Sequence, residues 1–322
     1  MDSITQLIVT DEFNSERLDV FITRVFDVIP SRSYSNKLIL NKKVKVDNKF
    51  QKPSFRLKTN QIVEVDLSFV FDKEISPQAE DIPLNILFED EHVIVIDKQA
   101  GMVVHPGAGV SSGTLVNALL NRCGCALPSL GSSARAGIVH RLDRDTSGVM
   151  VAAKTQLALT NLSKQFAEHK QIRKYHAIIF GQLQPLEGKI ETWHGRDTKN
   201  RIKFSVQKEG RGKIAILNYI THEILRSGLF SLVECQLHTG RTHQIRVQLS
   251  YLNHGILGDA LYSKIPPYII SDKKLFSLVS KNANRQMLHA VHLGFDHPIT
   301  GEALNFNSSY PVDFFNMLNL IR

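Results

Sequence analysis

The stretch "GIVHRLDRDTSGVMVAAKT" (Gly137–Thr155) places a dense polar cluster between two apolar runs. Within it, His140–Asp145 holds two carboxylates, two guanidiniums and an imidazole in six positions. The flanking runs predict a strand leading in and a strand leading out. Rigid strands that hold a polar loop are a common way to position catalytic groups. We therefore expect chemistry from Asp143 or Asp145; the alternative is that one of them caps a turn and pairs with an arginine.

The rest of the chain from Pro83 onward predicts an α+β fold. Strand-like runs outnumber helical ones and do not alternate with them regularly, which favours a mixed, largely antiparallel sheet with flanking helices. Examples of the expected strands are "HVIVIDK" (92–98), "MVVHP" (102–106) and "KYHAIIFG" (174–181), and of the expected helices "GTLVNALLNRC" (113–123) and "LALTNLSKQFAEHK" (157–170).

Positive charge is concentrated near the N-terminus. The 322 residues carry a formal charge of +8, and Arg32–Lys58 holds nine basic residues against one acid. Helical spacing in "RLDVFITRVF" (17–26) and alternation in "KVKVD" (43–47) and "QIVEVD" (61–66) predict a compact helix–helix–strand module. The positive charge indicates a polyanionic partner, most simply nucleic acid or an acidic membrane face; surplus surface lysine is the alternative. The acidic, proline-containing segment 67–83 reads as a linker.

Several function classes are disfavoured by the sequence. The N-terminus lacks a basic, apolar signal peptide, and no apolar run approaches the roughly 20 residues that cross a bilayer. Three cysteines without a framework of spacings indicate reduced thiols, so we expect a cytoplasmic protein without a membrane partner. The histidine spacings match no common zinc signature, so we predict no metal site. The sequence also has no phosphate-binding loop motif.

Two further stretches concentrate polar groups. "LHTGRTHQIRVQL" (237–249) has a helical apolar stripe with Arg246 near the helix start, where a cation is unfavourable unless a carboxylate or phosphate faces it. In "QIRKYHAIIFG" (171–181), Tyr175 follows two cations and enters an apolar strand. Such a tyrosine is either packed in the core or a platform on which a nucleobase stacks.

Taken in order, these stretches resemble the RluA-type family of RNA pseudouridine synthases. The resemblance covers residues 84–322, and "VVHPGAG" (103–109) is most similar to the D-type members that act on the large ribosomal subunit. The motifs are "HRLDRDTSG" (140–148), "RKYHAIIFG" (173–181), "WHGRDTKNRIKF" (193–204), "TGRTHQIRVQL" (239–249) and "RQMLHAVHLGFDHP" (285–298).

The basic N-terminal module resembles an S4 RNA-binding domain. Asparagines at Asn41 and Asn60 stand where that family usually has glycine, and asparagine tolerates left-handed backbone. The resemblances together imply four segments: an N-terminal extension at 1–15, an S4-like α/β domain at 16–66, a linker at 67–83, and a pseudouridine synthase domain with a central cleft at 84–322.

The resemblance also assigns roles to residues. Asp143 matches the catalytic aspartate of the family, Arg246 the arginine that pairs with it, and Asp145 is then structural. Tyr175 and Leu288 match the residues against the target base, Arg141 the arginine that fills the gap left by the base, and Arg241 is a further member of the site. The expected RNA-binding residues are Arg32, Lys37, Lys42, Lys43, Lys45, Arg196, Lys199, Arg201 and Lys203.

The implied reaction is isomerisation of uridine to pseudouridine, most simply in 23S rRNA or a large-subunit precursor particle, by a monomer that needs no cofactor. The base must be flipped out of its stack, and Asp143 then attacks C1′, adds to C6 or takes a proton from C2′. Alternatives are an RNA-binding or ribosome-assembly module without catalysis, and the same chemistry on other rRNA sites or tRNA. A glycosidase using Asp143 and Asp145 fits poorly, because its carboxylates must flank a sugar.

Overall fold

The computed structural model describes residues 4–26, 28–29, 32–67, 77–107, 109–124, 127–129, 135–200 and 202–322. The chain divides into two compact units, the first at Met1–Pro77 with Ser129–Ala136 and the second at Gln78–Pro128 with Gly137–Arg322. None of the helices in the described ranges has the length and apolarity needed to cross a membrane.

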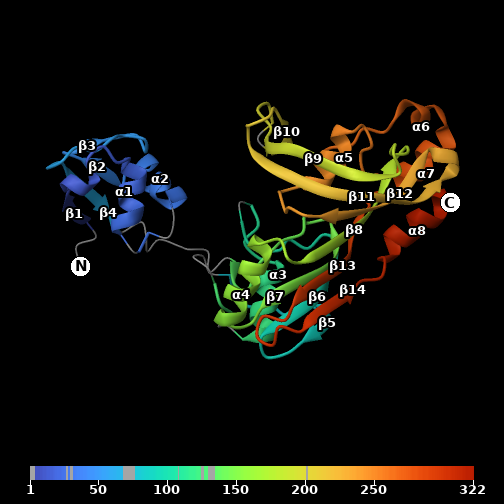
Figure 1. Ribbon diagram of the computed structural model, residues 1–322, viewed down its shortest axis with the longest axis horizontal. Coiled ribbons are helices and arrows are strands. Elements are labelled where there is room, and N and C mark those ends of the chain that lie inside the picture. The colour runs from blue at the N-terminus through green and yellow to red at the C-terminus, as the bar shows by residue number, and fades with distance from the viewer. Residues whose placement is uncertain are drawn as a thin grey trace. The chain divides into compact units, whose positions relative to one another are not determined.

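The first unit is a small antiparallel sheet with two helices (Figure 1). Its four strands lie in the order β1-β4-β2-β3, and the buried residues Leu18 and Phe21 of α1 pack with Val63 and Val65 of β4. Residues that the sequence analysis left in an N-terminal extension form the edge strand β1. The elements are β1 (Ile4–Ile8), η1 (Asp11–Phe13), α1 (Leu18–Val25), α2 (Arg32–Leu40), β2 (Val44–Val46), β3 (Lys49–Phe50) and β4 (Ile62–Asp66).

The two expected left-handed turns of this unit differ in outcome. Asn60 has a φ of 69°, as its place in the family pattern predicts. In the other turn the left-handed residue is Lys42, with a φ of 58°, and not Asn41.

The second unit is built on one ten-stranded sheet in the order β10-β9-β11-β12-β8-β13-β7-β6-β5, with β14 paired to β13. Among the described strands, only β7 and β13 pair in parallel, which confirms a mixed, largely antiparallel α+β fold. The strands are β5 (Asn85–Glu89), β6 (Val93–Lys98), β7 (Ser147–Ala153), β8 (Ile172–Phe180), β9 (Glu187–Arg196), β10 (Phe204–Gln207), β11 (Lys213–Leu225), β12 (Phe230–Leu237), β13 (Leu288–Asp296) and β14 (Ala303–Asn307). The helices are α3 (Leu115–Cys123), α4 (Gln156–Ala167), η4 (Arg226–Gly228), α5 (Gln244–Tyr251), α6 (Pro267–Ser271), α7 (Lys273–Asn282) and α8 (Val312–Ile321).

Strand β6 shows how this sheet is covered on both faces. Successive side chains of a strand point to opposite faces. Ile94 and Ile96 join one buried cluster with residues of α3, whereas Val93 and Val95 join another with residues of α4. Strand β7 beside it is buried along its whole length, so the charged loop that precedes β7 is anchored in the core.

Two expected strands are absent from the structure. The run "MVVHP" is irregular because the carbonyls of Val103 and Val104 accept the first amide hydrogens of α3, from Leu115 at 2.9 Å and Val116 at 3.0 Å. The run before the charged loop forms a single bridge, from Ile138 to Ala152, rather than a strand.

The glycine that closes the charged stretch is required by packing. Gly148 has a φ of 115°, and a Cβ atom on it would lie 2.2 Å from the carbonyl oxygen of Ala290. The missing side chain lets β13 approach β7, and Leu288 at the start of β13 thereby comes next to the charged loop.

Candidate active site

The loop between Asp143 and β7 is held by hydrogen bonds from other segments, two to its backbone carbonyls and one to a side chain. Lys98 Nζ donates to the Arg144 carbonyl at 3.0 Å, and Arg285 Nη1 donates to the Asp145 carbonyl at 2.9 Å. Gln286 Nε2 donates to Thr146 Oγ1 at 3.2 Å. These donors come from β6 and from the segment before β13, so tertiary contacts fix the loop conformation around Asp143.

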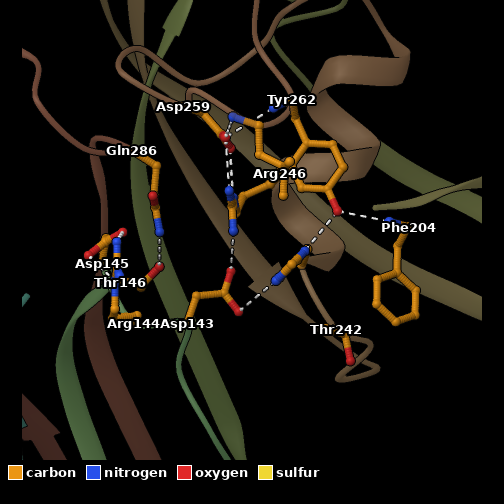
Figure 2. A network of polar contacts seen from close by, with 12 residues as sticks. Asp143, Arg144, Asp145, Thr146, Phe204, Thr242, Arg246, Asp259, Tyr262 and Gln286 are labelled. Carbon is orange, nitrogen blue, oxygen red and sulfur yellow. Dashed lines mark hydrogen bonds and ion pairs between the residues drawn. The ribbon is translucent and has the colours of Figure 1, made fainter. Parts of the chain in front are cut away.

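A buried chain of charges reaches Asp143 from α5 (Figure 2). Arg246 Nη1 donates to Asp143 Oδ2 at 2.9 Å. Its Nε and Nη2 donate to the two oxygens of Asp259 at 2.6 and 2.9 Å. Asp259 Oδ1 also accepts from the amides of Leu261 and Tyr262. The position of Arg246 near a helix start predicts a facing carboxylate, and the structure supplies two, Asp143 and Asp259.

These ion pairs keep Arg246 positively charged and leave a net negative charge at Asp143. Burial opposes the charge of Arg246, but the hydrogen bonds and charge of Asp259, followed by those of Asp143, outweigh it and raise the Arg246 pKa. Two carboxylates share one guanidinium, so one negative charge remains. Because the Asp259 side chain is fully buried and that of Asp143 is 16% exposed, Asp143 is the carboxylate that a ligand can reach.

An imidazole faces the second oxygen of Asp143. His243 Nε2 lies 3.7 Å from Asp143 Oδ1, while His243 Nδ1 lies 2.7 Å from the Tyr262 hydroxyl. That hydroxyl accepts from the Phe204 amide at 2.9 Å, so its own proton is free for Nδ1. Burial lowers the His243 pKa, which favours a neutral ring with its remaining proton on Nε2, toward Asp143.

The residues expected to contact the base line a cavity and a recess that share several wall residues. A cavity of about 400 Å³ is lined by Asp143, Tyr175, Arg141 and Arg241 among others. A recess of about 60 Å³ shares all four residues and adds Arg246 and Leu288. The larger volume lies in the range of small-ligand pockets. The structure thus brings together the six site residues expected from the sequence, four of them on both cavity and recess.

The second aspartate of the loop points elsewhere. Asp145 accepts from Arg144 Nε at 3.0 Å and from Arg144 Nη2 at 3.2 Å, and it does not line either space (Figure 2). The two aspartates therefore occupy different environments, although only one residue separates them.

One wall of the cavity carries a buried cation that sequence analysis noted only as a neighbour of Tyr175. Arg173 is 7% exposed, and it forms no ion pair with a carboxylate of the described residues. Its Nε is buried without a hydrogen-bond partner in the described part of the chain. Its guanidinium lies 5.8 Å from the Phe166 ring centroid. The Arg173 guanidinium is therefore a donor without an acceptor among the described residues, on the wall of the cavity.

A histidine next to Arg173 completes this wall. His140 stacks on Phe166 with ring centroids 4.6 Å apart, and burial together with the charge of Arg173 lowers its pKa to about 3. The His140 ring is therefore neutral, and it adds an aromatic face rather than a charge to the cavity.

The described members of the second group of expected RNA-binding residues lie at the end of β9 and in the connection to β10. The Arg196 guanidinium is 5.2 Å from the Phe204 ring centroid, and Lys203 Nζ is 5.9 Å from that of Tyr262. Lys199 is exposed between the two strands. Arg201 lies outside the described residues.

The basic residues of the first unit are partly neutralised by local carboxylates. Arg32 pairs with Asp19 at 2.8 Å, Lys43 with Asp66 at 2.8 Å and Lys45 with Glu64 at 3.3 Å. These acids lie outside the basic sequence segment, so its count of charges overstates the local surplus. Lys37 and Lys42 form no ion pair with described residues and are exposed.

Several site residues were missed by the sequence analysis. Asp259 follows a glycine in a loop that carries no recognisable motif. Lys98 is the last residue of an apolar strand, a position from which a lysine side chain normally reaches solvent. Arg285 and Gln286 belong to the motif "RQMLHA". The motif indicates that this segment contributes to the site, but it assigns no role to either residue. The partners of these four side chains in the charged loop and on α5 are remote in sequence, so no local pattern reveals these contacts.

Comparison with known proteins identifies the family. The RNA pseudouridylate synthase family matches residues 92–251. Ribosomal large subunit pseudouridine synthase D of Zymomonas mobilis is 44% identical over 270 residues, covering 83% of this chain and 82% of that protein. The protein of the same name from Xanthomonas campestris is 39% identical over 323 residues, covering 99% and 93%.

A solved structure agrees with the fold. Human RNA Pseudouridylate Synthase Domain Containing 4 superposes with a TM-score of 0.55 at 26% identity, covering 73% of this chain and 92% of that chain. Together with the sequence relatives, it shows that this chain belongs to the RluA-type family of RNA pseudouridine synthases, isomerases that convert uridine in RNA to pseudouridine.

Proposed function

We propose that Asp143 is the catalytic residue and that the chain modifies rRNA of the large ribosomal subunit. The observation that carries the first part is the buried chain Asp259–Arg246–Asp143, which aims one ionised carboxylate into a cavity lined by Tyr175. The second part is supported by relatives named for the large subunit that match 83% and 99% of this chain.

The charge arrangement suits a glycosidic isomerisation. Arg246 holds Oδ2 of Asp143, which fixes the direction in which Oδ1 faces the cavity. Asp259 supplies a second negative charge, so the guanidinium does not fully neutralise Asp143. This positions an ionised carboxylate for attack at C1′, addition at C6 or removal of the C2′ proton.

The cavity walls suit a flipped uridine. Tyr175 and Leu288, both buried, provide the apolar surface against which the detached base turns. Arg173, Arg141 and Arg241 line the larger cavity, where they would bind phosphates on either side of the extruded nucleotide.

The first unit is proposed to act as the S4-like RNA-binding module of a monomeric cytoplasmic enzyme. Its exposed lysines and the β9–β10 residues Arg196, Lys199 and Lys203 would bind phosphates remote from the target uridine. The target is rRNA alone or a precursor particle, since both present the same phosphates.

The first test is substitution of the two aspartates. Asp143→Asn keeps the shape of the side chain and removes only its charge, so we expect a loss of pseudouridine formation of at least about 10⁴-fold with RNA affinity nearly unchanged. The matched control Asp145→Asn removes a half-buried carboxylate of the same loop, outside the cavity, and should retain most activity. Equal losses in both variants would remove Asp143 from its proposed role.

The target class is tested by mapping pseudouridines in large-subunit rRNA from cells with and without the gene. Disappearance of a small group of sites that reappears with the wild-type gene, but not with Asp143→Asn, supports the rRNA assignment. An unchanged large subunit together with lost sites in another RNA would overturn that assignment and leave the reaction intact.

A further inference from the structure

Three titratable side chains meet on the sheet away from the reaction chemistry. Glu234 of β12 is paired in register with His176 of β8 on one side and with Ile220 of β11 on the other. A β-bulge between Thr221 and Glu223 leaves His222 without a partner on β12. Bulges re-aim side chains, and this one brings the His222 imidazole to Glu234.

The separations match a metal-ligand set better than a hydrogen-bonded one. Glu234 Oε2 lies 3.5 Å from Nε2 of His176 and 3.5 Å from Nε2 of His222. One ligand atom from each residue lies within 4.8 Å of the other two. Direct hydrogen bonds are shorter, about 2.7–3.2 Å. A tetrahedron with zinc–ligand bonds of about 2.0 Å has edges of about 3.3 Å, close to both observed separations.

The surroundings orient two of the three ligands. Nδ1 of His176 is hydrogen-bonded to the Tyr310 hydroxyl, which leaves Nε2 directed at Glu234. Metal-bound histidines usually have such a partner on the second ring nitrogen. Lys174 Nζ binds the other carboxylate oxygen, Oε1, at 3.0 Å, so Oε2 is the oxygen that faces both imidazoles.

The cluster is reached from a different cavity than the one that holds Asp143. Arg173 and Tyr175 of β8 line the active-site cavity, whereas Lys174 and His176 line a separate cavity of about 740 Å³ together with Glu234 and Tyr310. The side chains of His176 and Glu234 are 17% and 13% exposed, and that of His222 is 45% exposed. A metal ion from solvent therefore has access, and a water molecule can take the fourth position.

We propose that His176, His222 and Glu234 form a zinc site with one open position. Two imidazoles and one carboxylate are a donor set that zinc favours. The sequence predicts no metal site because the three residues lie on three strands and share no local spacing. Lys174 opposes a cation, but its side chain is 36% exposed and can leave Oε1 when the ion binds.

The test uses the full chain, freed of metal by chelator and titrated with zinc chloride in a calorimeter. We expect one zinc ion per chain and a rise in unfolding temperature on binding. His222→Ala should weaken binding at least tenfold, because it removes one ligand from an exposed position without disturbing the core. His238→Ala, the loss of another exposed histidine, should leave the affinity unchanged.

Two further measurements sharpen the result. Lys174→Met should tighten zinc binding severalfold, because it removes a cation next to the site. Cobalt substituted for zinc should give the visible absorption of tetrahedral coordination in the wild type and lose it in His222→Ala. Equal zinc affinity in wild type and His222→Ala, with both folded by circular dichroism, would overturn the proposal and leave a hydrogen-bonded cluster held by Lys174.

Discussion

Two buried arginines line the same active-site region and have opposite surroundings. Arg246 in the recess is held by Asp259 and Asp143 through three hydrogen bonds. Arg173 in the cavity wall has an unpartnered Nε and no ion pair with a described carboxylate. Burial lowers the Arg173 pKa, whereas the carboxylates raise that of Arg246 despite its burial.

The difference in ion pairing indicates two different roles for a buried arginine. A guanidinium that is already neutralised by carboxylates, as in Arg246, aims the Asp143 carboxylate and contributes to the stability of the fold. A buried guanidinium without an anion costs free energy until a ligand supplies the charge. The comparison therefore predicts that the same substitution will have opposite effects on stability at the two positions.

The largest effect is expected for Arg246→Met. It leaves the fully buried Asp259 carboxylate without its cation, so the free energy of unfolding should fall by about 3–5 kcal/mol and activity should be lost. Denaturant unfolding and pseudouridine formation measure both. The exposed pair in the same loop is the control, since Arg144→Met should cost no more than about 1 kcal/mol.

Arg173→Met should act in the other direction on stability. It removes a buried cation that lacks a carboxylate, so the free energy of unfolding should rise by about 1 kcal/mol. RNA affinity should fall, and the slope of log K against log salt should decrease by about 1. Lower stability with unchanged RNA binding would contradict the assignment of Arg173 as an anion receptor.

Lys98 is a third buried cation, held by three carbonyls instead of carboxylates. Burial lowers its pKa to about 7. Between pH 7 and about 10.4, Lys98 is protonated in the unfolded chain and not in the folded chain. The free energy of unfolding therefore increases as pH rises through this range. Below pH 7 both states bind the proton, and the contribution is constant.

The measurement is denaturant unfolding of wild type and Lys98→Met at several pH values. The wild type should gain stability relative to the variant by up to about 1.4 kcal/mol per pH unit above pH 7. The variant should also lose kcat more than it raises KM, because the Arg144 carbonyl loses a donor that positions the catalytic loop. A difference in stability that does not change with pH would argue against a lowered pKa.

The smallest expected effect is on RNA binding by the first unit. There, too, basic residues with carboxylate partners can be compared with basic residues that lack them. Lys37 and Lys42 lack carboxylate partners among the described residues, whereas Lys43 and Lys45 pair with Asp66 and Glu64. Replacing the first two by glutamine should lower the salt slope of RNA binding by about 2, and replacing the second two should lower it less. Filter binding at several salt concentrations distinguishes the pairs, and equal slopes would show that local ion pairing does not matter.

Much of the architecture follows from local patterns. The short apolar run "HVIVIDK" predicts β6, which is buried on both faces, and the apolar stripe after Gly240 predicts α5. "MVVHP" has the composition of a strand but caps the start of α3 instead, because hydrogen bonds to a helix start compete with strand pairing. Local composition does not show which partner a carbonyl will find.

The amino-acid sequence by itself determines the family, the mixed sheet and the residues that gather around Asp143. These properties are carried by short motifs whose periodicity and spacing depend on near neighbours. Tertiary structure decides that Asp259 shares the charge of Arg246 with Asp143, and that Arg173 is buried without a carboxylate. Burial and charge pairing depend on residues tens to more than a hundred positions apart, and only the folded chain brings these together.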